Sequence, residues 1–188
     1  DLNFLGSDRV IATAVLAGSD GITLVDPGPT SCLPRLEAGL RDRGYTLRDV
    51  RHLLLTHIHL DHAGAAGTIA ERVPGIRVFV HERGAPHLID PAKLLASATR
   101  LYGDRMDILW GAFQAVPAEQ VVVLKGGEQL DLGGRAMRVA YTPGHAKHHV
   151  SYLDDAQGVA YVGDTAGVQV SGEFLIAPTP PPDIDIEA

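Results

Sequence analysis

The chain has 188 residues, of which 45% are hydrophobic and 21% charged, and its net charge is −7. This balance is typical of one folded globular domain and excludes a disordered chain or a coiled coil. The acidic charge argues against a nucleic-acid partner, because such proteins carry a basic surface that displaces counterions.

The N-terminal part of the chain predicts a hairpin, a helix and a buried strand. Residues 10–16 and 22–25 are short apolar runs joined by a glycine-containing turn, a pattern typical of a hairpin. Thr30 or Ser31 is expected to cap a helix that runs to about Arg43. Residues 50–56 have the length and apolar character of a buried strand. This strand leads directly into a histidine-rich loop.

The rest of the chain alternates helices and strands. Residues 63–72 predict a helix and residues 76–80 a strand, so the order of elements predicts an α/β layered domain. Residues 86–117 predict a helical insertion, which could serve as a lid over a site or simply add to the core. Further strands are predicted at 121–124, 129–132, 135–141, 150–153 and 159–162. Residues 177–188 form a proline-rich tail that leads towards a further element.

Four candidate metal ligands stand within six residues: His57, His59, Asp61 and His62. Zinc-type ions bind imidazole nitrogen and carboxylate oxygen. On an irregular loop, His57 and His59 could share one ion while Asp61 and His62 face a second. A solvated surface loop is the alternative, but four such residues at the end of a buried strand favour a metal site.

Two further candidates follow strands in the second half of the chain. His145 ends the turn Thr-Pro-Gly-His after the strand 135–141, and Asp164 follows the strand 159–162. Each alone has an ordinary explanation as a turn residue. Together with the first cluster, both become candidate ligands of the same site.

These motifs, with the earlier Val-Asp-Pro-Gly at 25–28, resemble those of the metallo-β-lactamase superfamily, and the match runs through most of the chain. The resemblance implies a single domain over residues 1–188 with the α/β fold of the family, a four-layer αββα sandwich whose metals lie at one edge between two sheets. The motifs are specific for fold and metal site. They are not specific for substrate, because the family includes β-lactamases, lactonases, hydroxyacylglutathione thioesterases, phosphodiesterases and nucleases.

Carried over residue by residue, the resemblance assigns every candidate a role. It places His57, His59 and His145 on the first ion, Asp61 and His62 on the second, and Asp164 between both. Asp26 and His149 match residues that support the ligands without binding an ion, a common arrangement around metals. His148 has no assigned role and is expected at the surface. His52, His81 and His87 are expected to be ordinary surface or packing residues.

One expected ligand is absent from the sequence. Family members usually supply a last histidine to the second ion from a later strand, and no histidine follows His149. The resemblance therefore implies a C-terminally truncated chain. A weak or empty second site and a ligand from another molecule are the alternatives. A missing strand would leave a sheet edge open, which favours pairing of two copies as a homodimer.

The resemblance implies a metal-dependent hydrolase with two zinc ions, for which iron or manganese are alternatives. A hydroxide generated from metal-bound water would attack a small ester, lactone, thioester, β-lactam or phosphoester. Asp61 is the expected catalytic residue, because it could both bind metal and orient the hydroxide. Substrate-binding residues stay unknown, with Tyr102, Tyr141 and Lys147 as weak candidates. The rival hypotheses are a mononuclear-iron sulfur dioxygenase-like enzyme and a catalytically weak binding module of the same fold.

The sequence also predicts where the protein works. No stretch approaches the roughly 18 consecutive apolar residues of a membrane span, and the single cysteine, Cys32, allows no internal disulfide. We therefore expect a cytoplasmic protein without a membrane partner. Because the sequence begins with Asp1, a removed signal peptide stays an open alternative.

Overall fold

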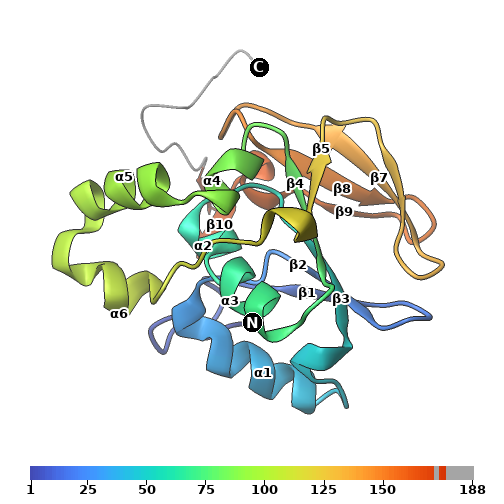
Figure 1. Cartoon of the computed structure of the whole chain (residues 1–188), viewed down its shortest axis with the longest axis horizontal. Coiled ribbons are helices and arrows are strands. Elements are labelled where there is room, and N and C mark those ends of the chain that lie inside the picture. The colour runs from blue at the N-terminus through green and yellow to red at the C-terminus, as the bar shows by residue number, and fades with distance from the viewer. Residues whose placement is uncertain (172–173, 177–188) are drawn as a thin grey trace.

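Two β-sheets face each other in the computed structural model of the chain, which describes residues 1–171 and 174–176 (Figure 1). The first sheet has the order β1-β2-β3-β4-β5, with β1 antiparallel to β2 and the other neighbours parallel. Its strands are β1 (Ala14–Ala17), β2 (Ile22–Val25), β3 (Val50–Leu54), β4 (Arg77–His81) and β5 (Val121–Leu124). The second sheet is antiparallel and contains β6 (Gln129–Asp131), β7 (Ala136–Tyr141), β8 (Val150–Asp154) and β9 (Val159–Tyr161). A separate hairpin follows, formed by β10 (Val168–Ser171) and β11 (Phe174–Ile176).

Short helices connect the strands of the first sheet. The α-helices are α1 (Leu33–Arg41), α2 (Leu60–Ala63), α3 (Ala66–Arg72), α4 (Ala85–Ile89), α5 (Ala92–Tyr102) and α6 (Met106–Trp110). The 3-10 turns are η1 (Thr30–Cys32), η2 (Leu47–Asp49), η3 (Gly103–Arg105), η4 (Ala118–Gln120) and η5 (Gly163–Ala166). Among the helices of the described residues, none combines the length and the apolar character that crossing a membrane requires.

The core has two layers, one on each face of the first sheet. On one face, leucines of α1 and small residues of α3 pack against alternate side chains of β2, β3 and β4. On the other face, Leu54 and Phe79 pack against Met137, Val139 and Tyr152 of the second sheet. Coverage on both faces explains why every residue of β2 is buried, as expected for the inner strands of a parallel sheet. The described residues thus supply the helix, sheet and sheet layers of the expected αββα sandwich, and the fold class is confirmed.

The sheet topology brings the candidate site residues to one edge. β2 and β3 are parallel neighbours, so Asp26 and His57 both follow the carboxyl ends of adjacent strands. β7 and β9 flank β8 in an antiparallel sheet and therefore run in the same direction. His145 and Asp164 come after these two strands, which is why segments distant in sequence reach the same edge.

The predicted helix after β2 forms, but its start differs from the prediction. α1 begins at Leu33 after a 3-10 turn, and neither Thr30 nor Ser31 caps it. The hydroxyl of Thr30 instead donates to the carbonyl oxygen of Gly64 at 3.0 Å, and that of Ser31 to Leu109 at 2.6 Å. These hydroxyls therefore tie the turn to α2 and α6, long-range contacts that no local pattern could reveal.

The segment 86–117 is helical, as predicted, up to Trp110. Its end is anchored, because Trp110 stacks on Phe4 with ring centroids 5.6 Å apart and Tyr102 packs edge-on against Trp110 at 5.2 Å. α5 itself contributes only Ala98 to the buried residues. Its function as a lid stays a prediction. The proline-rich tail, residues 177–188, lies outside the described residues.

Tyr152 links the two sheets through a buried hydroxyl. It donates to the carbonyl oxygen of Leu55 at 2.9 Å, with that of Phe79 at 3.4 Å. We expect Tyr152→Phe to lower the free energy of unfolding by about 1 kcal/mol, the usual net worth of a buried hydrogen bond. Urea denaturation would measure the change. Tyr161→Phe is the control, because the Tyr161 hydroxyl has no hydrogen bond among the described residues; equal losses in both variants would contradict the expectation.

Candidate metal centre

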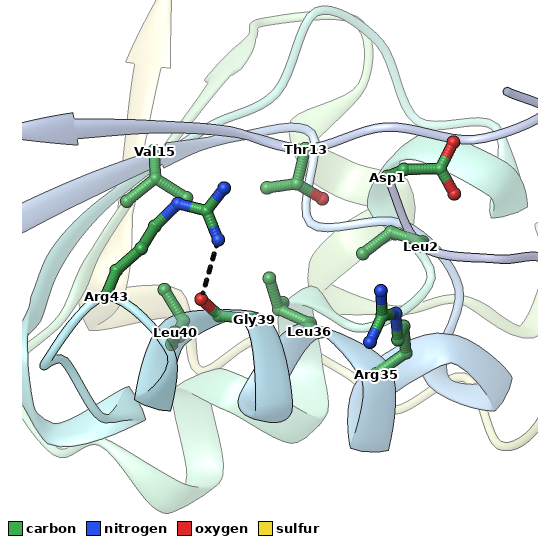
Figure 2. A pocket seen from close by; sticks show the side chains of 9 residues that line it. All are labelled: Asp1, Leu2, Thr13, Val15, Arg35, Leu36, Gly39, Leu40 and Arg43. Atoms are coloured by element: carbon green, nitrogen blue, oxygen red, sulfur yellow. Dashed lines mark hydrogen bonds between the residues drawn. The ribbon is translucent and has the colours of Figure 1, made fainter. Parts of the chain in front are cut away.

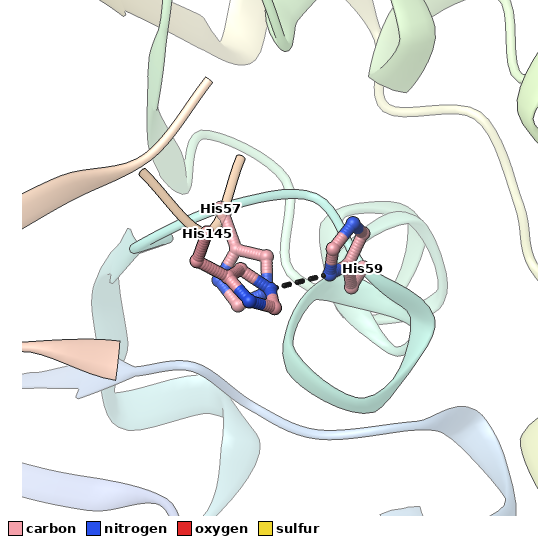
Figure 3. Close-up of side chains that lie close together, drawn as sticks. All are labelled: His57, His59 and His145. Atoms are coloured by element: carbon pink, nitrogen blue, oxygen red, sulfur yellow. Dashed lines mark hydrogen bonds between the residues drawn. The ribbon is translucent and has the colours of Figure 1, made fainter. Parts of the chain in front are cut away.

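Three imidazole rings meet at the carboxyl end of β3 (Figure 3). His57 and His59 come from the loop after β3, and His145 comes from the loop between β7 and β8. The ring centroids of His57 and His59 lie 4.5 Å apart, and His145 lies 4.8 Å from each of them. One nitrogen of each ring lies within 4.8 Å of the others. Such a set of convergent imidazoles is the donor set that zinc-type ions prefer.

His57 gives the clearest sign that an ion belongs here. Its ring is fully buried, and its Nδ1 lies 3.1 Å from the hydroxyl of Thr56. Its other nitrogen, Nε2, is buried and has no hydrogen-bond partner among the described residues. Buried polar atoms are nearly always partnered, so this atom fits a metal ligand.

The charge state of the rings also suits metal binding. Burial, followed by the nearby His62 and His59, holds the pKa of His57 well below its usual value. Burial and then His145 lower the pKa of His59 to about 4. Both rings are therefore neutral near pH 7 and offer a lone pair, as an imidazole ligand must.

A second group adjoins the first and shares one ring with it. It consists of His57, His62 and Asp164, whose ligand atoms also lie within 4.8 Å of one another. Asp164 Oδ1 is 3.1 Å from His62 Nε2, whereas Asp164 Oδ2 is 3.5 Å from His145 Nε2. One carboxylate thus faces both groups, which is the position expected for a ligand between two ions.

Asp26 supports this arrangement through hydrogen bonds to His62 and Thr56. Its Oδ2 lies 2.9 Å from His62 Nδ1, so the opposite nitrogen of His62 points at Asp164. Its two oxygens also accept the backbone N–H and the hydroxyl of Thr56, at 2.8 and 2.7 Å. Such partners fix the orientation of a metal-binding imidazole. Thr56 was not singled out in the sequence, although its place between the strand and the cluster was a usable signal.

The charge of His62 depends on these carboxylates. Burial lowers the pKa of His62, but Asp26, Asp164 and Asp61 outweigh this effect and hold the pKa well above its usual value. An ion bound at Nε2 would take the place of the proton there, because metal ligands must be deprotonated.

Asp61 lies at the open side of the cluster. Its Oδ2 is 3.4 Å from His62 Nε2, and its side chain is 38% exposed. Burial raises the pKa of Asp61, but the hydrogen bond and charge of His62 outweigh this and lower it, so the carboxyl is ionised near pH 7. Asp61 belongs to neither compact group of ligand atoms. Its metal-binding and catalytic roles stay predictions.

His149 and His148 behave differently from each other. His149 is buried and holds Asp164 by accepting its backbone N–H at Nε2, 3.3 Å away. His148 was expected at the surface, and this was wrong. Its ring is half-buried beside His59, with centroids 5.5 Å apart, and its Nδ1 is buried without a partner among the described residues. No local pattern predicts a partner for His148, but the loop that carries it folds against the cluster.

The remaining histidines belong to neither compact group of ligand atoms among the described residues. His52 and His81 are buried packing residues, and His52 lies 3.2 Å from the hydroxyl of Thr23. The Tyr141 hydroxyl donates to the Lys147 carbonyl oxygen at 2.9 Å, so its proton is already used. A cavity of about 270 Å³ lies elsewhere, between α1 and the N-terminal segment (Figure 2). None of the candidate ligands lines it.

Comparison with known proteins identifies relatives along nearly the whole chain. The family model described as the metallo-beta-lactamase superfamily matches residues 7–186. A metallo-beta-lactamase fold-containing protein of Sulfurisphaera tokodaii, ST1585, is 36% identical over 137 residues, which are 71% of this chain and 51% of that protein. A hydroxyacylglutathione hydrolase of a Bradyrhizobium species is 30% identical over 157 residues, which are 80% of this chain and 49% of that protein.

Solved structures that resemble this chain also include members of the metallo-beta-lactamase superfamily. The archaeal metallo-beta-lactamase superfamily protein ST1585 from Sulfolobus tokodaii superposes with a TM-score of 0.73 at 28% identity, covering 94% of this chain and 65% of that chain. A family protein from Thermus thermophilus gives a TM-score of 0.66 at 29% identity, covering 84% and 55%. The chain thus spans about half to two thirds of the length of these relatives.

Proposed function

The chain belongs to the metallo-β-lactamase superfamily, and we propose that it is a metal-dependent hydrolase of small ester, lactone, thioester, β-lactam or phosphoester substrates. One observation carries the proposal. The Asp164 carboxylate faces two adjoining groups of ligand atoms that share the fully buried His57. Nothing in ordinary packing requires a partnerless imidazole nitrogen beside a carboxylate in this position.

In this proposal each side chain has a defined task. His57, His59 and His145 hold the first ion, and His62 with Asp164 holds the second, with Asp61 as a further ligand. Zinc-type ions held there would supply Lewis-acid chemistry, because such ions polarise a carbonyl or phosphoryl oxygen and lower the pKa of bound water to about 7. Asp26 fixes the orientation of His62, and His149 that of Asp164. The ionised Asp61, at the exposed side, orients water and accepts its proton.

Acyl thioesters are the first substrates to test. Two of the relatives, from Synechococcus and Bradyrhizobium species, are named hydroxyacylglutathione hydrolases. Their names apply to those proteins, and the chain covers at most half of each. The donor set itself suits any substrate with a polarisable carbonyl or phosphoryl oxygen.

The test is a substrate panel run on the metal-free chain after loading with zinc, manganese or iron. It contains acyl thioesters, lactones, aryl esters, β-lactams and aryl phosphoesters. We expect turnover of at least one class, and we expect the double variant His59→Ala/Asp61→Ala to lose turnover and to retain less metal. Unchanged activity in that variant on any confirmed substrate would refute the assignment. Iron in protein purified without added metal, together with oxygen uptake on a persulfide, would instead support the dioxygenase alternative.

A further inference from the structure

A chain of hydrogen bonds leads from the second sheet to the candidate bridging carboxylate. The hydroxyls of Ser151 and Thr142 lie 2.9 Å apart, and Thr142 Oγ1 lies 2.9 Å from His149 Nδ1. His149 Nε2 is then 3.3 Å from the backbone nitrogen of Asp164. His149 is 0% exposed and Ser151 is 4% exposed, so water competes little with these bonds.

The chemistry of the four groups fixes the direction of each proton. A backbone N–H can only donate, so Nε2 of His149 must be the acceptor. A neutral imidazole carries one proton, which must then be on Nδ1 and points at the Thr142 hydroxyl. Thr142 Oγ1 accepts the hydrogen bond from Nδ1, and the hydroxyl hydrogen of Thr142 can then donate a hydrogen bond to Ser151 Oγ. The arrangement therefore allows one tautomer of His149.

The turn that carries Asp164 has little room to move independently of His149. Gly163 has a φ of +48°, and a Cβ built there would lie 2.6 Å from both His149 Nε2 and Thr56 Oγ1. The backbone is thus pressed between the imidazole of His149 and the threonine that binds Asp26. A change in the position of the His149 ring would move Asp164 as well.

We propose that Thr142 and Ser151 are positioning residues for the metal centre. Thr142 accepts the hydrogen bond from Nδ1 of His149 and so stabilises the tautomer whose Nε2 holds the Asp164 amide, which places the Asp164 carboxylate between the two groups of ligands. Ser151 orients the Thr142 hydroxyl and contributes less, because it is one bond further from the ring. The inference rests on the two-ion site of the proposed function, but its first readout does not require metal.

The test compares Thr142→Val, which keeps the shape of the side chain but removes its hydroxyl, with Thr142→Ser, which keeps the hydroxyl. Nitrogen-15 NMR of the metal-free protein reports the His149 tautomer directly. We expect the proton on Nδ1 in the unchanged protein and in Thr142→Ser. In Thr142→Val we expect a mixture of tautomers and faster hydrogen exchange at the Asp164 amide.

The second readout is calorimetric titration with zinc. Loss of a residue that orients a ligand usually lowers metal affinity 10–100-fold. We expect a decrease of about that size in Thr142→Val for the ion held by His62 and Asp164, an unchanged first ion, and restoration in Thr142→Ser. An unchanged tautomer in Thr142→Val would overturn the inference, as would equal weakening of both ions. If the unchanged protein bound no metal, the proposed function would fail, while the NMR result would still decide the role of Thr142.

Discussion

Replacing His57 by alanine is expected to abolish metal-dependent turnover. His57 is the only side chain that belongs to both groups of ligand atoms found among the described residues, so its loss removes a donor from the proposed first ion and alters the surroundings of the second group. Outer partners of metal ligands already contribute 10–100-fold to affinity or activity. We therefore expect a decrease in turnover of more than about a hundredfold, together with loss of metal measured by elemental analysis of the purified protein.

His52→Ala is the matched control for this variant. His52 is also a buried histidine, lies on β3 itself and bonds Thr23 rather than any candidate ligand. Its replacement removes the same buried volume from the same region. We expect reduced thermal stability but normal metal content and turnover per folded molecule. If His52→Ala and His57→Ala lose metal equally, the effect of His57 is structural and the ligand assignment is wrong.

The second large effect is expected at Asp26, where alanine and asparagine should differ. Asp26 has a φ of +50° and accepts three hydrogen bonds, two from Thr56 and one from His62. Alanine leaves these buried donors unpaired, at a cost of 1–3 kcal/mol for each donor. We expect Asp26→Ala to lower the free energy of unfolding by at least about 3 kcal/mol, measured by urea denaturation.

Asparagine separates folding from metal binding. It tolerates positive φ better than most residues and keeps one oxygen for the Thr56 backbone. Its amide group, however, donates a proton towards His62 Nδ1, so the proton of that ring moves to Nε2, the atom that faces Asp164. We expect Asp26→Asn to retain more stability than Asp26→Ala yet to bind the second ion 10–100-fold more weakly. Zinc binding like that of the unchanged protein would contradict the role given to Asp26.

The sequence predicted most of the fold because its patterns are local. The apolar runs of β2, β3 and β4 are bounded by turn residues, and the structure forms strands within one or two residues of the expected positions. The local patterns could not predict which strands are neighbours within a sheet. β5 lies beside β4 in the first sheet, although the four strands that follow it in sequence, β6 to β9, form the second sheet.

In the candidate site, too, the local motifs were predictable and the long-range contacts were not. The cluster from His57 to His62 was evident because four candidate ligands are close in sequence, and His145 and Asp164 could be added as candidates because each follows a strand. The hydrogen bonds that orient these histidines could not be predicted from sequence spacing. Thr56, Thr142 and Ser151 are common residue types, and their roles depend on which histidine each one meets in space. His148 was misjudged for the same reason.

X-ray absorption at the zinc edge, on protein loaded with less than one equivalent of zinc, would identify the ligand atoms of the first ion. The three rings of His57, His59 and His145 converge on one point, and Cys32 is outside the cluster. We expect a first coordination shell of nitrogen and oxygen with the outer-shell scattering of several imidazoles, and loss of that signal in His57→Ala. A sulfur ligand, or a shell of oxygen alone without imidazole scattering, would contradict it.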